Sequence, residues 1–172
     1  FDEAESSYKQ AIALKPDYFE AYNNFGNTLQ ELGRFDEAES SYKQAIALKP
    51  DYAEVYLNLC GLLEKMNRVD EVLFIVRDAS GKTLEKKADF LYYEALTEFR
   101  KENYETASEL VKKININELF DKRQQSLMKL QADLYHQKKD YSAAFEAYKF
   151  KNKLLQDSSE YKKQDPDEYF SQ

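Results

Sequence analysis

An 18-residue segment occurs twice in this chain without a single change, and it constrains the fold more than any other feature. The segment FDEAESSYKQAIALKPDY occupies residues 1–18 and again residues 35–52, so equivalent residues are 34 apart. A catalytic site has no use for two identical segments of this length. Stacked repeats do, because each copy packs against the next in the same way. The segment therefore predicts a repeat array and directs the search for function toward binding surfaces.

The apolar residues within one period predict two helices, one over residues 18–32 and one over 35–48. They follow the i, i+3, i+4, i+7 spacing of a single helical face. In the first helix these positions are Ala21, Tyr22, Phe25, Leu29 and Leu32. Gly33 is expected to end the first helix in a left-handed conformation. We expect Asp17 and Asp51 to cap the helices that follow them.

Two small residues at equivalent positions predict close contacts between helices. Gly26 lies in the middle of the first helix, where glycine costs about 1 kcal/mol relative to alanine. Cys60 takes the same place one repeat later, so we interpret it as a small buried packing residue and not a reactive thiol. It is the only cysteine, which excludes an intrachain disulfide and hence a disulfide-stapled secreted fold.

Taken together, these residues resemble the tetratricopeptide repeat. The resemblance rests on Tyr22, Phe25, Gly26, Leu29, Phe35, Ala38, Tyr42, Ala45 and Pro50. The first of these positions is often Trp in that family, and here it is Tyr. The resemblance implies an all-α fold, a right-handed superhelix of antiparallel helix pairs.

The pattern continues in a weaker form toward the C-terminus. We expect an array over residues 1–160, followed by a tail over 161–172. Within the array, the expected segments are an unpaired second helix over 1–14 and repeats at about 19–52, 53–86, 88–120 and 125–158. The last helix is expected to turn polar over 145–159, because the end of a stack needs a polar outer face.

Composition limits the classes of partner. The net charge of −7 argues against a nucleic-acid partner, since a phosphate-binding surface needs clustered Lys and Arg. No apolar run approaches the roughly 18 residues that span a bilayer, so we expect no membrane association. The chain shows no signal-peptide pattern and opens inside a repeat. We therefore expect a cytoplasmic protein whose native N-terminus lies further upstream.

No motif predicts catalysis. Residues 80–83, SGKT, end like a phosphate-binding loop, but that loop needs a glycine where Val76 stands and must join a strand to a helix. His136 is the only histidine, and neither a catalytic triad nor a metal-ligand spacing surrounds it. We expect no cofactor, no metal and no enzyme activity in this chain.

The predicted site is a concave groove lined by first helices, which binds an extended peptide or a partner helix. Asn24 and Asn58 are equivalent residues, and an asparagine row can bind a peptide backbone because its amide both donates and accepts hydrogen bonds. The row is similar to the asparagine ladder of O-linked N-acetylglucosamine transferases. The alternative is that these residues only bond one repeat to the next.

Aromatic and arginine residues further along, such as Phe99 and Arg100, are typical of binding hot spots, although they fit a packing role equally well. The predicted groove residues are Asn23, Asn24, Asn27, Leu57, Asn58, Tyr92, Leu96, Phe99, Arg100, Lys129 and His136.

Two further interpretations stay open. Residues 145–170 resemble the stretch after the last repeat of tetratricopeptide-repeat sulfotransferases. This implies that the chain could be the non-catalytic arm of a larger transferase, a sulfotransferase or a glycosyltransferase. The unpaired helix over 1–14 exposes an apolar stripe that includes Tyr8 and Ile12, from which we expect self-association.

Overall fold

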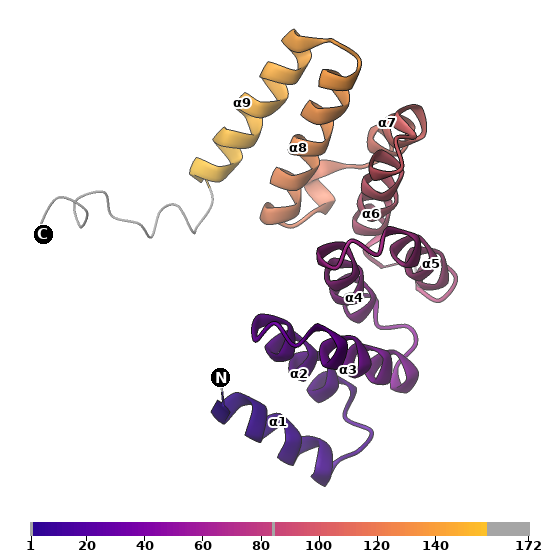
Figure 1. The fold of residues 1–172 in the computed structure, drawn as a ribbon, viewed down its shortest axis with the longest axis vertical. Helices are drawn as coiled ribbons and strands as arrows, with labels where there is room; N and C mark the ends of the chain where they lie inside the picture. Colours follow the sequence, from indigo (N-terminus) through magenta and orange to yellow (C-terminus); the bar gives the residue numbers. More distant parts are fainter. Residues whose placement is uncertain (1, 84, 158–172) are drawn as a thin grey trace, which may run out of the picture. The chain divides into compact units, whose positions relative to one another are not determined.

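The computed structural model describes residues 2–83 and 85–157, and every regular element in these ranges is helical (Figure 1). The expected all-α class is confirmed. The elements are α1 (Asp2–Leu14), α2 (Phe19–Glu31), α3 (Phe35–Leu48), α4 (Ala53–Lys65), α5 (Val69–Ser80), α6 (Lys87–Arg100), α7 (Tyr104–Lys112), the short 3-10 helix η1 (Ile116–Glu118), α8 (Asp121–Gln137) and α9 (Tyr141–Asp157).

The chain divides into two compact units, Phe1–Tyr93 and Glu94–Gln172. In the first unit, helices that follow one another in sequence pack together, from α1 on α2 through to α4 on α5. In the second unit, α7 packs on α8 and α8 packs on α9. The first helices α2, α4 and α8 therefore each contact both the second helix before them and their own partner.

One backbone turn recurs between the two helices of successive pairs. The turn residue has a positive φ in each case: 74° at Gly33, 59° at Asn67, 64° at Glu102 and 59° at Lys139. The next N–H then donates to a carbonyl five residues back, as from Arg34 to Leu29 at 2.9 Å. The left-handed Gly33 is confirmed. Since three other residue types hold the same conformation, the turn does not depend on glycine's freedom.

The expected aspartate caps are wrong. α2 begins after Tyr18 and α4 after Tyr52, and neither helix has a side-chain cap hydrogen bond. A backbone bond from Tyr52 N to Lys49 O, 3.2 Å long, carries the chain one residue beyond Asp51 before the helix starts. The Asp51 carboxylate instead lies 3.1 Å from Lys49 Nζ.

The close approach expected at Gly26 is confirmed. A Cβ added to Gly26 would lie 2.6 Å from Cε1 of Tyr42, whose side chain is fully buried. The Tyr42 hydroxyl donates to Asn27 Oδ1 at 2.7 Å. The Ser41 hydroxyl donates to the Tyr22 carbonyl oxygen at 2.8 Å. α3 is thus held on α2 by one tight ring contact and two hydrogen bonds.

The same two positions carry other residues in later pairs. Cys60, which is buried as expected, replaces Gly26. The equivalent combinations are Gly26 with Tyr42, Cys60 with Val76, Ala95 with Val111, and Ala132 with Tyr148. In the two middle pairs, the first-helix residue is larger than Gly26 and the second-helix residue is smaller than Tyr42. The two changes offset each other and keep the space between the helices filled.

Two arginine clusters tie consecutive repeats together. Arg34 bridges Glu5 at 2.8 Å and Glu37 at 2.6 Å. Arg68 makes the same pair of contacts one repeat later, with Glu39 and Glu71. Burial raises the pKa of Glu39, but hydrogen bonds from Arg68 and Lys43 outweigh it and leave that pKa below the ordinary value. The clusters are therefore ionised and intact near neutral pH.

Candidate binding surface

In the first unit, three predicted asparagines meet on α2 and α4. Asn23 is buried, and its Oδ1 accepts a hydrogen bond from Asn58 Nδ2 at 2.9 Å. Its own Nδ2 donates to Asn24 Oδ1 at 3.4 Å. Asn23 and Asn58 thus bond one repeat to the next, which is the alternative left open by the sequence. The side chain of Asn24, in contrast, is exposed.

The other predicted residues of the first unit are engaged in packing. Asn27 accepts the Tyr42 hydroxyl and is half-buried. Leu57 is only 7% exposed and Tyr92 only 8%. The ring of Tyr92 lies edge-on to Tyr93, with the ring centroids 5.5 Å apart. These side chains offer a partner little surface.

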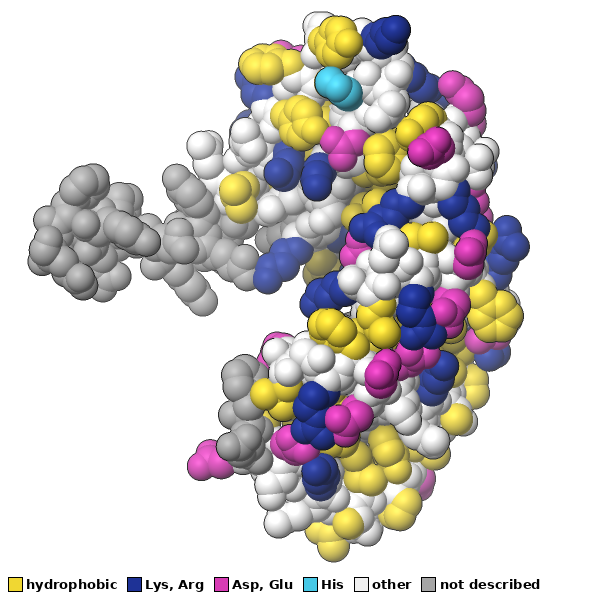
Figure 2. Space-filling view, in the orientation of Figure 1, with side chains coloured by type: hydrophobic (Ala, Val, Ile, Leu, Met, Phe, Trp, Pro, Cys, Tyr) yellow, Lys and Arg dark blue, Asp and Glu magenta, His cyan; other side chains and the backbone are white. Residues whose placement is uncertain are grey.

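In the second unit, the predicted residues lie on α6 and α8. Leu96 and Phe99 are half-buried, and Phe99 contacts the Tyr104 ring edge-on at 5.5 Å between centroids. Arg100, Lys129 and His136 are exposed. The chain's one histidine is visible among exposed hydrophobic side chains in Figure 2. Its ring lies 5.4 Å from that of Tyr141, centroid to centroid.

Helix α9 carries an aromatic surface that was not predicted from the sequence, made by Phe145, Tyr148 and Phe150. α9 does extend to Asp157, but its expected polar outer face is wrong, since Phe145 is 65% exposed and Phe150 45% exposed. Together with Lys149 and Lys153, these residues line a shallow pocket. Comparison of equivalent positions would have found part of this surface, because Phe150 stands where α3 carries the exposed Gln44.

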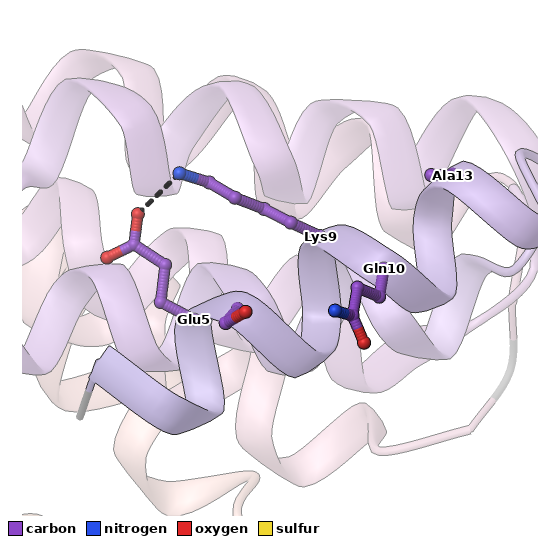
Figure 3. Close-up of a pocket in the computed structure, with 5 residues that line it drawn as sticks. Glu5, Lys9, Gln10 and Ala13 are labelled. Atoms are coloured by element: carbon purple, nitrogen blue, oxygen red, sulfur yellow. Dashed lines mark ion pairs between the residues drawn. The ribbon is translucent and has the colours of Figure 1, made fainter.

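A shallow pocket on α1 does not qualify as a site (Figure 3). It is lined by Glu5, Ser6, Lys9, Gln10 and Ala13, with Lys9 Nζ 2.7 Å from Glu5 Oε1. The residues of α3 equivalent to the last four are exposed as well. The pocket is therefore the ordinary outer surface of a second helix.

The described residues contain no group of three or more His, Cys, Asp or Glu side chains placed to hold a metal ion. Nor does any described helix have the length and apolar composition needed to cross a membrane. In the SGKT stretch, Gly81 ends helix α5, and Lys82 Nζ lies 2.8 Å from Asp78 Oδ2. A phosphate-binding loop would follow a strand, so this stretch lacks that architecture.

Comparison with known proteins agrees with this geometry. A family model described as "TPR repeat" matches residues 1–33 and 26–66. A search of curated proteins found no match.

Several solved structures are similar over most of their length. MamA from Desulfovibrio magneticus RS-1 is 19% identical, with a TM-score of 0.70, over 91% of this chain and 88% of that one. PilF from Pseudomonas aeruginosa is 20% identical, with a TM-score of 0.71, over 89% and 77%. A Thermus thermophilus protein, titled a thermophilic TPR protein, is 17% identical with a TM-score of 0.68, over 91% and 84%.

The helix pairs, their recurring turn and these matches define a helical-repeat protein. Residues 1–66 match the tetratricopeptide-repeat model, and the chain as a whole has the fold of the tetratricopeptide-repeat proteins to which it is similar. The resemblance of residues 145–170 to sulfotransferases receives no support from these comparisons and stays a prediction. Part of that segment lies outside the described residues.

Proposed function

We propose that the chain is a non-catalytic protein-interaction scaffold whose first helices bind an extended peptide or a partner helix. The observation that carries the proposal is the row Asn58–Asn23–Asn24 on consecutive first helices. Two of its members hold each other in place, and the third, Asn24, is exposed. A side-chain amide held in this way can pair with a peptide backbone regardless of the peptide's side chains.

In the second unit, exposed cationic side chains indicate the charge of the partner. Arg100 and Lys129 are exposed on its first helices, although the whole chain has a net charge of −7. Half-buried Phe99 lies one residue before Arg100. Aromatic and arginine residues dominate binding energies at many interfaces, and cationic side chains favour acidic partners. We propose that the partner segment bound here is acidic.

The transferase-arm alternative makes a different prediction. In that interpretation the scaffold serves an attached sulfotransferase or glycosyltransferase, and the full reading frame would continue into a catalytic domain. No observation on the described residues favours it over the scaffold.

The test uses peptides selected on the whole chain from a random library. The double variant Asn24→Ala/Arg100→Ala removes two exposed side chains and so should leave the fold intact, which circular dichroism checks. We expect at least a tenfold loss of affinity for the selected peptides. The matched control, Gln44→Ala/Arg77→Ala, removes exposed side chains from second helices and should bind normally. Equal affinity of the two double variants would place the binding surface elsewhere.

A further inference from the structure

Three side-chain amides of α2 and α4 form one hydrogen-bonded row, which we call the amide relay. Asn58 Nδ2 donates to Asn23 Oδ1 at 2.9 Å, and Asn23 Nδ2 donates to Asn24 Oδ1 at 3.4 Å. Each amide therefore donates to the next one, in the order Asn58, Asn23, Asn24. No single amide can turn round within the relay, because turning would bring two oxygens or two NH2 groups together. The three amides thus hold one another in one direction.

The two ends of the relay present opposite groups. Asn24 Nδ2 at one end and Asn58 Oδ1 at the other form no hydrogen bond with any residue that the structure describes. Asn24 is exposed and Asn58 is half-buried. The relay does not continue into α6, where the equivalent residue is the buried Tyr93. The Asn24 end is therefore open to donate a hydrogen bond, and the Asn58 end is open to accept one.

Packing alone does not require an amide at position 23. Leu57 is the equivalent residue of α4 and is buried as well, being 7% exposed against 3% for Asn23. A leucine side chain therefore fits this position of the repeat. An amide buried there costs free energy unless it is hydrogen-bonded, and Asn23 bonds to the other two asparagines. What the amide adds over leucine is the link between Asn24 and Asn58.

We propose that Asn23 is a positioning residue, which fixes Asn24 as the donor and Asn58 as the acceptor toward a bound segment. The segment places a backbone carbonyl at Asn24 and a backbone N–H at Asn58. Hydrogen bonds in a row polarise one another, so Asn23 also couples the two ends. This role rests on the scaffold function proposed above and specifies the chemistry of its partner.

The relay favours an extended peptide over a partner helix, the other occupant proposed above. Within a helix, the backbone N–H and C=O groups already bond to each other, so the middle of a helix has none to offer. An extended segment keeps both groups free for a partner. Its side chains need not match the relay, since only the backbone bonds to the amides. The occupant of the relay is thus an extended peptide.

The probe is the tightest peptide selected on the whole chain, labelled with fluorescein and synthesised with one backbone N–H at a time replaced by an ester oxygen. Fluorescence anisotropy gives the affinity of each version. We expect one ester to weaken binding roughly fivefold, as the loss of a single hydrogen bond does. In Asn58→Ala that ester should cost nothing more, because the same bond is already lost. In Asn24→Ala its full cost should remain, because Asn24 contacts a carbonyl.

Asn23→Leu tests the positioning role, because it copies Leu57 and leaves both ends of the relay in place. The selected peptide should bind roughly threefold more weakly, and the ester should cost less affinity, since Asn58 is no longer held. The matched control is Thr28→Val, which removes another buried polar group of α2, a hydroxyl that bonds within its own helix at 3.1 Å. This control should change neither the affinity nor the ester cost. Circular dichroism checks that both variants are folded.

An ester cost that disappears in Asn24→Ala but persists in Asn58→Ala would reverse the two ends and overturn the proposal. So would an unchanged affinity and ester cost in Asn23→Leu. Binding that tolerates every ester, yet is lost in Asn24→Ala/Arg100→Ala, would overturn the relay and leave the scaffold function standing. Selected peptides that bind this double variant normally would overturn the scaffold function, and the relay with it.

Discussion

At the scale of single residues, packing between paired helices is set by the combined size of two side chains. Gly26 leaves room for a tyrosine, whereas Cys60 and Ala95 are accompanied by valine. Tyr148, whose hydroxyl donates to Asp133 next to Ala132, is 38% exposed, although the equivalent Tyr42 is fully buried. At Gly26, an added Cβ would occupy the space that the Tyr42 ring fills.

Gly26→Ala should therefore destabilise the chain. The helix gains about 1 kcal/mol from alanine, but overpacking a buried site costs about 1–3 kcal/mol. We expect a net loss of about 1 kcal/mol in the free energy of unfolding, measured by urea denaturation. In a Tyr42→Val background, the same substitution should become neutral or stabilising, since it recreates the Ala95–Val111 combination. A loss of equal size in both backgrounds would contradict the steric explanation.

At the scale of helices, consecutive repeats are joined by charge as well as by apolar contact. The arginines lower the pKa of their glutamate partners, chiefly through hydrogen bonds from Arg34 to Glu37 and from Arg68 to Glu71. A carboxylate whose pKa is lower in the folded chain stabilises the fold above its unfolded pKa, near 4.5. That contribution disappears as the pH falls through the folded value.

The pKa is lowered also for the two glutamates that reach these arginines from the preceding repeat: for Glu5 by hydrogen bonds from Lys9 and Arg34, and for Glu39, although burial raises it, by hydrogen bonds from Arg68 and Lys43 that outweigh the burial. Acid should thus weaken the junction between repeats.

Arg68→Met tests this effect. At pH 7 it should lower the free energy of unfolding by about 1 kcal/mol, a modest figure because the pairs are partly exposed. The difference from the unmodified chain should shrink as the pH falls below about 4.5 and vanish once the glutamates are protonated in both chains. Arg77→Met, which alters an exposed arginine on α5, should have little effect at either pH. A cost that persists unchanged into acid would assign the role of Arg68 to packing.

At the scale of the whole chain, the stability of each helix should depend mainly on the helices next to it in sequence, and not on the chain as a whole. Within each unit, most contacts join helices adjacent in sequence. Repeat arrays of this kind behave as a sum of repeat and nearest-neighbour contributions. Local damage should therefore stay local.

Leu62→Ala in α4 and Leu127→Ala in α8 both remove fully buried leucine side chains and should cost about 2–5 kcal/mol locally. Hydrogen exchange followed by NMR should show reduced amide protection in α3–α5 for the first variant and in α7–α9 for the second. A uniform loss of protection in either variant would indicate that the chain unfolds as one cooperative block.

The sequence was sufficient to predict the fold, but it predicted only part of the candidate site. One duplicated segment and the spacing of residues such as Gly26 predicted the helix pairs, because the same packing recurs in each repeat. The burial of Asn23, Leu57 and Tyr92 was not predicted. Residue spacing shows on which face of a helix a residue lies, but it does not show how far the next helix covers that face. Identical residues on α1 and α3 differ in burial for that reason.

The position of α2 between two helices of identical sequence also bears on how the chain reaches its native state. In the unfolded chain, the surface around Gly26 meets two chemically indistinguishable tyrosines, Tyr8 and Tyr42. Side-chain chemistry cannot choose between them. The choice falls to the connecting segments, residues 15–18 on one side and 32–34 on the other, and thus to which loop closes in the required direction. A perfect duplication makes the finished stack regular, but it also gives the folding chain a well-matched wrong pairing that it must escape.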